Sequence, residues 1–445
     1  MDPSARTPAP DPLTVVEDLG RYVLESPSSF HAAHAAAARL DSAGFERLDE
    51  AADWSGPGTP GVRGRRYVVR DGAIIAWATP ADLLPAAGFR ILGAHTDSPS
   101  FKLKPRPTTT THTWHQAAVE VYGGPLLNSW LDRELRMAGR LVLRGDDGAP
   151  VEHLTATGPV ARIPQLAVHL DREANKGLAL DRQQHVQPVW GVGAAQDADV
   201  LALLAEHAAD GPVDPARILG YDVVLADSQP PAVFGKDGAL FASGRLDNLS
   251  SVHAGLGALV REAEAVEAGP HVAVLAAFDH EEIGSGTRSG AAGPFLEDVL
   301  ARVDAALGRT DAEHRRALAA SVCLSADAGH LVHPNYQGHH DPVNTPEPGA
   351  GPLLKINADQ RYATDAVGAG IWAEACARAG VPYQEFVSNN RVPCGSTIGP
   401  ITAARLGIRT VDVGIGLLSM HSARELCHVD DVAALGAVAG AFFTG

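Results

Sequence analysis

Cysteine is scarce in this sequence, with only four thiols in 445 residues. Cys323, Cys376, Cys394 and Cys427 lie far apart, and no two of them form a C-x-x-C pair. A disulfide framework needs a dense set of cysteines, and a zinc ribbon needs closely spaced pairs. The sequence therefore argues against both kinds of site and favours a reducing compartment, so we expect a cytoplasmic protein.

Long apolar segments and an excess of positive charge are also missing. The N-terminus, MDPSARTPAPDP, lacks the apolar stretch of a signal peptide, and no uncharged apolar run is long enough to span a bilayer. The formal net charge is −17, whereas binding of nucleic acid requires a basic face. We therefore expect neither a membrane nor a nucleic acid as a partner. Solubility alone explains the charge, but an enzyme of this charge that acts on acidic substrates must build a local cationic pocket.

Three common signatures of catalytic or nucleotide-binding sites do not occur. The sequence contains no HExxH, no GxSxG and no GxxxxGK[ST]. The glycine-rich segments GVG at 191–193 and GIG at 414–416 are weak nucleotide signals, and we interpret them as turns. The chemistry must therefore be sought in residues that are scattered along the chain.

Helical and strand-like patterns alternate along most of the chain. Apolar periodicity predicts helices over 13–25 and 29–43, after Asp247, and from Asp365 to Arg378 with Gly380 as the closing residue. Continuous apolar runs, typical of strands buried on both faces, occupy 67–69, 73–79, 89–94, 271–278, 321–325 and 410–413. This alternation predicts a three-layer α/β/α domain. Between about 103 and 228, short runs of alternating apolar and polar residues with Gly-Asp and Asp-Gly turns predict an inserted β-rich domain. The α/β domain would then comprise residues 1–102 and 229–445.

Five short segments end in residues suited to holding metal ions: GAHTD at 93–97, GRLDN at 244–248, FDHEE at 278–282, SADAG at 325–329 and MHS at 420–422. Their donors are His95, Asp247, Glu282, Asp327 and His421. Two imidazoles and three carboxylates suit zinc, cobalt or manganese in a hydrolytic site. Four of these segments follow predicted strands, whose carboxyl ends meet at one edge of an open sheet. Asp247 instead precedes a predicted helix, where it would bridge two metals or simply cap that helix.

Two neighbouring carboxylates, Glu281 and Glu282, form the most specific local signal. Two anions this close are unfavourable without a cation beside them. Successive extended residues point to opposite sides, so one can face a metal while the other faces the attacking water. We therefore expect Glu281 to be a general base for a metal-activated water. Asp97, two residues after His95, is suited to accept the other ring N–H of that histidine, although a lone HxD pair is more often structural.

Longer segments resemble the M18 family of metalloaminopeptidases, the aspartyl aminopeptidases. They are GAHTDSPSFKLKP, SGRLDNLSSV, AAFDHEEIGSGTRSGA, HPNYQGHHDPVNTPEPGAGPLLKINADQRYATDA, PCGSTIGPITAARLGI and GIGLLSMHSARE, and the resemblance runs from about residue 14 to the end. It implies a zinc-peptidase domain interrupted by a β-rich dimerisation domain, and a cocatalytic dizinc site. One ion would be held by His95, Asp247 and Asp327, and the other by Asp247, Glu282 and His421, with Glu281 as general base and Asp97 as the partner of His95.

The resemblance further implies dimers assembled into a tetrahedral dodecamer. A histidine of the dimerisation domain reaches a neighbouring subunit's active site in that family, and His169 in QLAVHLDRE is the matching residue. The alternative is a histidine that is merely satisfied on a β-strand.

A preference for peptides with N-terminal Asp or Glu comes mainly from the resemblance. Lys355 is a candidate for the cationic pocket, with Arg361 and Tyr362 nearby, and His330 and His333 are further candidates near Asp327. A lysine beside an apolar segment is more commonly solvent-facing, so this assignment stays open. Two other functions also stay open: a dimetal carboxypeptidase or N-acyl amino acid deacylase, and a non-catalytic assembly or cargo protein.

Overall fold

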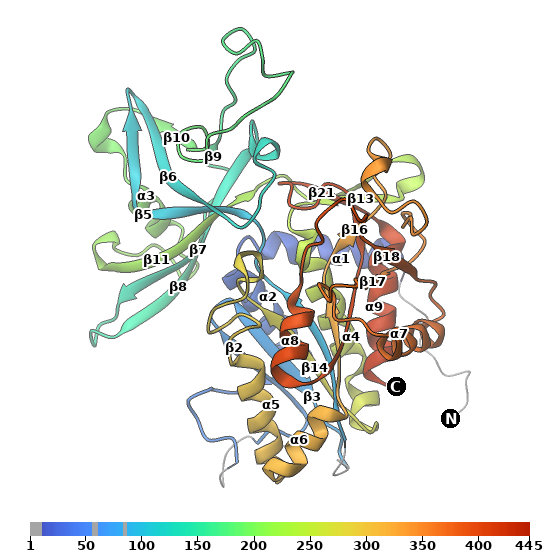
Figure 1. Cartoon of the computed structure of the whole chain (residues 1–445). Coiled ribbons are helices and arrows are strands. Elements are labelled where there is room, and N and C mark those ends of the chain that lie inside the picture. The colour runs from blue at the N-terminus through green and yellow to red at the C-terminus, as the bar shows by residue number, and fades with distance from the viewer. Residues whose placement is uncertain (1–10, 56–60, 83–86) are drawn as a thin grey trace.

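The computed structural model describes residues 11–55, 61–82 and 87–445. It contains two bodies, a larger one built around a central sheet and a smaller one rich in strands (Figure 1). The central sheet has nine strands in the order β1 (Glu46–Arg47), β2 (Arg65–Arg70), β3 (Ala73–Ala78), β14 (Val272–Phe278), β4 (Phe89–His95), β15 (Val322–Ala326), β19 (Arg409–Gly414), β17 (Leu353–Ile356) and β18 (Gln384–Val387).

The middle of this sheet is parallel. Strands β14, β4, β15 and β19 run in the same direction. Strand β3 is antiparallel to both of its neighbours, whereas β17 is antiparallel to β19 and parallel to β18. All seven residues of β14 are buried, as expected for a strand covered on both faces. Phe278 pairs with His95, so these two strands end level with each other. The strand ends that carry the candidate ligands therefore lie at one edge of the sheet.

Helices cover both faces of the central sheet. The core on one face includes residues of α1 (Pro12–Glu25), α2 (Ser29–Ser42), α4 (Leu246–Glu267), α7 (Ala366–Ala379) and α9 (Val429–Phe443). The core on the other face includes residues of α5 (Phe295–Ala306), α6 (Asp311–Ala319) and α8 (Ile398–Leu406). The predicted three-layer architecture is confirmed, as are the Asp365 cap and the Gly380 end of α7. Strands β17 and β18 were not expected and make the sheet wider than predicted.

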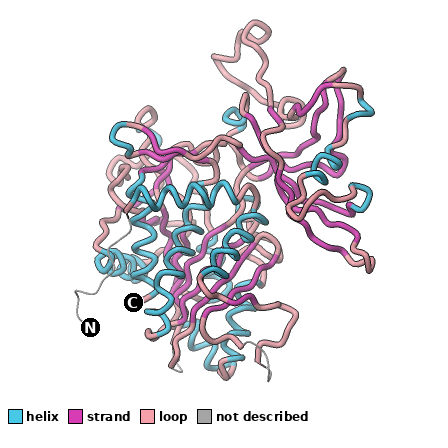
Figure 2. Tube along the Cα trace, turned by 180° about the vertical axis from the view of Figure 1, so that it is seen from behind, coloured by secondary structure: helices cyan, strands magenta, loops and turns pink. Residues whose placement is uncertain are grey.

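The smaller body is a separate antiparallel sheet with its own core. Its strands are β5 (Ser100–Thr111), β6 (Trp114–Tyr122), β7 (Glu134–Arg144), β8 (Pro150–Ala156), β9 (Ala161–Arg162), β10 (Val189–Val192) and β11 (Ile218–Asp227), with the short helix α3 (Val200–Glu206). Strand β11 pairs with both β5 and β7, so the sheet closes on itself. Seen from behind, helices gather around the larger body and the smaller one is mostly strand and loop (Figure 2).

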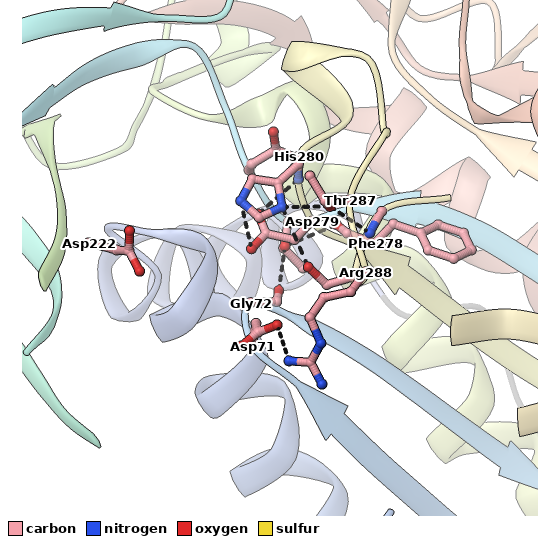
Figure 3. A network of polar contacts seen from close by, with 12 residues as sticks. Asp71, Gly72, Asp222, Phe278, Asp279, His280, Thr287 and Arg288 are labelled. Atoms are coloured by element: carbon pink, nitrogen blue, oxygen red, sulfur yellow. Dashed lines mark hydrogen bonds and ion pairs between the residues drawn. The ribbon is translucent and has the colours of Figure 1, made fainter. Parts of the chain in front are cut away.

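Ion pairs join the two bodies. Arg140 of β7 binds Asp71, in the turn between β2 and β3, and also Asp222 of β11, at 3.0 Å in each case. Arg288 binds the other oxygen of Asp71 at 2.6 Å (Figure 3). The guanidinium of Arg140 also lies 4.4 Å from the ring centre of Phe30. These contacts fix the smaller body against α2 and the end of the central sheet.

The segment between β9 and β10 projects away from the rest of the molecule (Figure 1). The sequence predicted short β-rich runs in this region, but the strand β9 ends at Arg162 and residues 164–170 are loop and turn. Leu166, Val168 and Leu170 are exposed there, because no second strand pairs with them to bury one face. In the described parts of the chain, every helix is too short or too polar to cross a membrane.

Candidate metal centre

The five predicted donors come together at the carboxyl edge of the central sheet. His95 is the last residue of β4, and Asp327 follows β15 directly. Asp247 stands in the first turn of α4, and Glu282 lies in η6 (Glu281–Ile283) after β14. His421 lies in the loop after β20 (Gly416–Leu417). In the described residues, the five donors form two groups in which all donor atoms lie within 4.8 Å of one another, His95 with Asp247 and Asp327, and Asp247 with Glu282 and His421. Glu281 forms a further group of this kind with His95 and Glu282.

The two groups share Asp247. Its Oδ1 lies 3.3 Å from His95 Nε2, and that nitrogen is 3.5 Å from Asp327 Oδ1. Its Oδ2 lies 3.5 Å from His421 Nε2. Nitrogen and oxygen ligands of a tetrahedral zinc, at bond lengths of about 2.0–2.1 Å, stand about 3.3–3.4 Å apart. The donor spacing therefore fits a zinc in each group, with Asp247 as the bridge between them.

Two buried oxygen atoms lack the partners that burial demands. Asp247 Oδ1 and Glu282 Oε1 have no hydrogen-bond partner. An unpaired buried carboxylate oxygen is costly unless a cation neutralises it. In the described residues, the contacts of the Asp247 carboxylate favour the metal-binding alternative over the helix cap, because Oδ1 accepts no hydrogen bond and Oδ2 faces the imidazole of His421. The following peptide, Asp247–Asn248, is cis.

The charges of the centre also suit a bound cation. From the protein groups alone, burial raises the pKa of Glu281 to about 7 and the pKa of Glu282 well above its usual range. Burial opposes protonation of His421, but its contacts with Asp247 and Glu282 raise its pKa to about 10. Neighbouring carboxylates likewise raise the pKa of His95 against the effect of burial. Carboxylates and imidazoles in this cluster thus retain protons in the place of a stronger cation.

Asp97 supports the His95 side of the centre. His95 Nδ1 lies 3.1 Å from the backbone carbonyl of Asp97 and 3.4 Å from its Oδ1. The same carboxylate accepts hydrogen bonds from the backbone N–H groups of Glu281, at 3.0 Å, and Glu282, at 3.1 Å. It also accepts one from the hydroxyl of Tyr122, at 2.8 Å. Asp97 therefore holds the loop of the two glutamates as well as standing beside the histidine.

The expectation that Glu281 and Glu282 follow a strand in extended conformation is wrong. Strand β14 ends at Phe278, and the two glutamates lie in one turn of 3-10 helix after His280, whose φ is +64°. Side chains of consecutive residues diverge in such a turn also, since it has about three residues per turn. Glu281 Oε2 lies 4.0 Å from His95 Nε2, whereas Glu282 Oε2 lies 3.5 Å from His421 Nε2. Glu281 therefore lies beside the imidazole of His95, and Glu282 beside that of His421.

The segment before this turn is braced by its own polar contacts (Figure 3). Asp279 Oδ1 accepts the backbone N–H of His280 at 2.9 Å, and His280 Nδ1 lies 3.0 Å from the hydroxyl of Thr287. Arg288, next to Thr287, is tied to Asp71. The loop that delivers both glutamates is therefore attached to the junction of the two bodies.

His421 has a different kind of support. Its φ is +66°, which is uncommon for a residue with a side chain. Its Nδ1 lies 3.0 Å from the carbonyl of Gly124, just after β6, so Nδ1 carries the proton and Nε2 is left for a metal. Glu425 accepts hydrogen bonds from the backbone N–H of His421, at 2.7 Å, and of Asp247, at 3.0 Å. Sequence reasoning missed Tyr122, Gly124 and Glu425, because no local motif marks contacts between such distant segments.

Lys355 of β17 lies at the centre rather than in solvent. It is 1 % exposed, and its ammonium donates to the carbonyls of Asp327, at 2.9 Å, and Ala328, at 3.2 Å. The ammonium lies 5.1 Å from the ring centre of Tyr362. Lys355, Tyr362 and His330 line one cleft of about 570 Å³ together with the candidate ligands. The solvent-facing alternative for Lys355 is therefore wrong.

The remaining candidates lie away from this cleft. Arg361 is exposed, and His333 lines a neighbouring hollow with His330 and Tyr336. His169 is exposed in a turn of the segment that projects between β9 and β10. In the part of the chain that the structure describes, His169 belongs to none of the groups of side chains that could hold a metal ion.

Comparison with known proteins supplies an independent line of evidence. Residues 22–443 match the family model described as aminopeptidase I zinc metalloprotease (M18). A probable M18 family aminopeptidase 2 of Streptomyces coelicolor is 50 % identical over 417 residues, which cover 93 % of this chain and 94 % of the relative. The cryo-EM structure of the Ape4 and Nbr1 complex contains a chain that is 34 % identical, with a TM-score of 0.93 over 97 % of this chain and 86 % of that one. The mApe1 dodecamer of S. cerevisiae is 28 % identical, with a TM-score of 0.84 over 96 % of both chains.

Proposed function

This chain belongs to the M18 family of zinc metalloaminopeptidases, and from that membership we propose a dizinc enzyme that removes N-terminal aspartate or glutamate from peptides. The observation that carries the two-metal part is the arrangement of Asp247, whose two oxygens face the imidazoles of His95 and His421. A carboxylate placed in this way could bridge two ions.

The ligand assignment follows from the two groups of donors. His95, Asp247 and Asp327 hold one ion, and Asp247, Glu282 and His421 hold the other. Zinc is the expected metal in this family, and cobalt or manganese also suit the donor set. When bound, the two ions polarise the scissile carbonyl and make water a better nucleophile at neutral pH.

Glu281 is the proposed general base. Its carboxylate forms a donor group with His95 and Glu282, but it lies outside the two groups that share Asp247, and its backbone N–H donates to Asp97. From the protein groups alone, burial raises its pKa to about 7, the range in which a carboxylate can both accept and return a proton. Glu281 takes the proton of the attacking water and delivers it to the leaving amine.

The preference for acidic substrates rests on Lys355. Its ammonium donates to the carbonyls of Asp327 and Ala328 and lies 3.8 Å from Asp327 Oδ2, so its positive charge faces the cleft beside a candidate ligand. A substrate carboxylate could pair with this ammonium, while Tyr362 and His330 line the same cleft. Without that lysine, the carboxylates of the centre would repel an acidic side chain.

Self-association is part of the proposal. The solved S. cerevisiae relative is a dodecamer, and we infer dimers and a tetrahedral dodecamer for this chain, with the smaller β-rich body as the dimerisation domain. In such an assembly, His169 of one subunit would donate a hydrogen bond to the oxyanion formed in another. The exposed position of His169 and the apolar residues around it support this role. We also propose a cytoplasmic location, with neither a nucleic acid nor a membrane as a partner.

Lys355 also supports a second candidate function. An ammonium beside two metals could pair with a free α-carboxylate instead of an acidic side chain, as a carboxypeptidase or an N-acyl amino acid deacylase requires. A panel of aminoacyl amides, C-terminal peptides and N-acyl amino acids separates these activities. A non-catalytic scaffold is disfavoured, because it would not need five donors and a base in one cleft.

The direct test is zinc content measured together with activity. The purified protein should hold two zinc ions per subunit and hydrolyse Asp- and Glu-amide substrates. Chelation should abolish this activity, and added zinc should restore it. Turnover that persists after the metal is removed, or hydrolysis of N-acyl amino acids in preference to acidic amides, would contradict the proposal.

A further inference from the structure

Glu425 is a buried carboxylate that is not among the predicted ligands. It is 2 % exposed and is the first residue of β21 (Glu425–His428). This strand pairs with β13 (Leu240–Ser243), and Glu425 stands opposite Ser243. Ser243 precedes the segment that leads to Asp247. The strand pairing therefore places the Glu425 carboxylate between the bridging aspartate and the loop that carries His421.

The two oxygens of Glu425 serve two different ligands. Oε1 accepts the backbone N–H of His421 at 2.7 Å, and Oε2 accepts the backbone N–H of Asp247 at 3.0 Å. One side chain thus fixes the main chain at two donors that are far apart in sequence. Both donors belong to the group of Asp247, Glu282 and His421, whereas the group of His95, Asp247 and Asp327 shares only Asp247 with it.

The His421 loop needs this support more than the other ligand segments do. His421 has a positive φ and is not in a strand, so the sheet does not fix its backbone. Asp97 has the corresponding role at the other histidine, where it accepts the backbone N–H groups of Glu281 and Glu282. Glu425 and Asp97 therefore have similar roles, because each carboxylate accepts hydrogen bonds from two backbone N–H groups of the candidate site.

We infer that Glu425 is a positioning residue that sets Asp247 and His421 for the ion in the group with Glu282. The inference rests on the proposed two-metal function. It gives a specific expectation, because loss of Glu425 should weaken the retention of one of the two ions and leave the other largely intact. Substitution of partners that orient metal ligands typically costs about 10–100-fold in metal affinity.

Glu425→Gln tests this inference with little change of shape. Glutamine keeps one acceptor oxygen, but its amide group faces the second backbone N–H with a donor. Asp431→Asn is the matched control, since Asp431 is 1 % exposed and accepts the backbone N–H groups of Gly349 and Gly351, both at 2.9 Å, without contacting a ligand. Zinc retained by each full-length protein is measured after dialysis against graded concentrations of a chelator, and folding is checked by circular dichroism and thermal unfolding.

Glu425→Gln should lose one zinc per subunit at about 10–100-fold lower chelator concentration than wild type, while Asp431→Asn keeps both. In a His421→Gln background, Glu425→Gln should cause little further loss. Equal zinc retention in wild type and Glu425→Gln, or the same loss in Asp431→Asn, would overturn the inference. If Glu425→Gln does not fold, Glu425→Asp is judged by the same criteria, because it keeps the charge but is too short to reach both N–H groups.

The same experiment separates the inference from the function on which it rests. Wild-type protein with a single ion would contradict the two-metal proposal. Loss of that single ion in Glu425→Gln but not in Asp431→Asn would still support positioning by Glu425.

Discussion

The two histidines of the centre perform the same task with different support. His95 is 1 % exposed, ends a central strand and stands beside Asp97. His421 lies in a loop, and its side chain is 32 % exposed. Its Nδ1 contacts the carbonyl of Gly124, and its backbone N–H donates to the carboxylate of Glu425. The sheet of the larger body positions His95. Contacts between distant segments, one of them in the smaller body, position His421. We therefore expect the position of His95 to tolerate substitutions elsewhere in the protein and the position of His421 to be sensitive to them.

The largest effect is expected from substitution of Glu281, the proposed general base. Glu281→Gln should lower kcat about 10²–10⁴-fold, because glutamine cannot accept the proton of the attacking water. Zinc content should stay near that of the wild type, since this side chain is outside both three-residue ligand sets. Preserved turnover, or an equal loss of zinc, would exclude Glu281 as the general base.

The comparison itself is tested by removing each histidine in turn. His95→Gln takes away a buried imidazole that contacts Asp97, Asp247 and Asp327. We expect it to lower the free energy of unfolding of the chelator-treated protein by about 1–3 kcal/mol. His421→Gln should cost less, because its site is partly solvated, although each variant should lose zinc. Equal destabilisation in denaturant titrations would show that the two sides do not differ in support.

Lys355 donates a hydrogen bond to the backbone carbonyl of Asp327, which belongs to the same donor group as His95, and it lines the cleft. Lys355→Met should lower kcat/KM for Asp- and Glu-amides about 10–100-fold relative to neutral amides, because a charged hydrogen bond is worth about 1.5–3 kcal/mol. Lys102→Met, which removes an ion pair with Asp222 in the smaller body, is the control. A uniform loss on all substrates would instead indicate that Lys355 only holds Asp327 in place.

Acid should weaken the binding of zinc. From the protein groups alone, the pKa of His421 is raised to about 10 and that of His95 is also raised, so both imidazoles retain a proton at neutral pH. A metal binds only the neutral imidazole and must release that proton. Apparent zinc affinity should therefore rise with pH between 6 and 8, by about tenfold per unit for each proton released. Competition with a chromogenic chelator measures the slope, and a flat profile would contradict it.

A smaller effect should show that the β-rich body also reaches the His95 side. Tyr122→Phe removes the hydroxyl that donates to Asp97 Oδ2, at a cost of about 0.5–1.5 kcal/mol, or about two- to tenfold in kcat/KM. Tyr221→Phe removes a hydroxyl bonded to the carbonyl of Lys104, within the same body but away from the centre. If both variants are equally active, the hydroxyl of Tyr122 has no role in the reaction.

The sequence was most informative where the sheet determines the geometry. Buried strands read as continuous apolar runs, and donors at their carboxyl ends must meet, so this pattern alone brings His95, Glu282 and Asp327 together. The turn at Glu281 was not predicted, because the positive φ of His280 leaves no sign in an apolar pattern. Lys355 was left undecided, since the strand that buries it was itself not predicted.

The groups that support His421 could not be predicted from the sequence, for a different reason. Glu425 acts on backbone N–H groups, which every residue type except proline possesses, so neither the type of residue nor its spacing marks the contact. Gly124 contributes only a carbonyl oxygen. Such contacts depend on how β21 pairs with β13 and how the two bodies meet, and this information is distributed over the whole chain.

The hydrogen bond between His421 and the Gly124 carbonyl has a consequence for engineering. Excision of the smaller lobe, to obtain a minimal monomeric peptidase, would delete the group that selects the tautomer of a ligand. Re-joining the chain after His95 would restore the sheet but not this acceptor. Grafting another module at the same place would succeed only if its first hairpin returned a carbonyl oxygen to the same point.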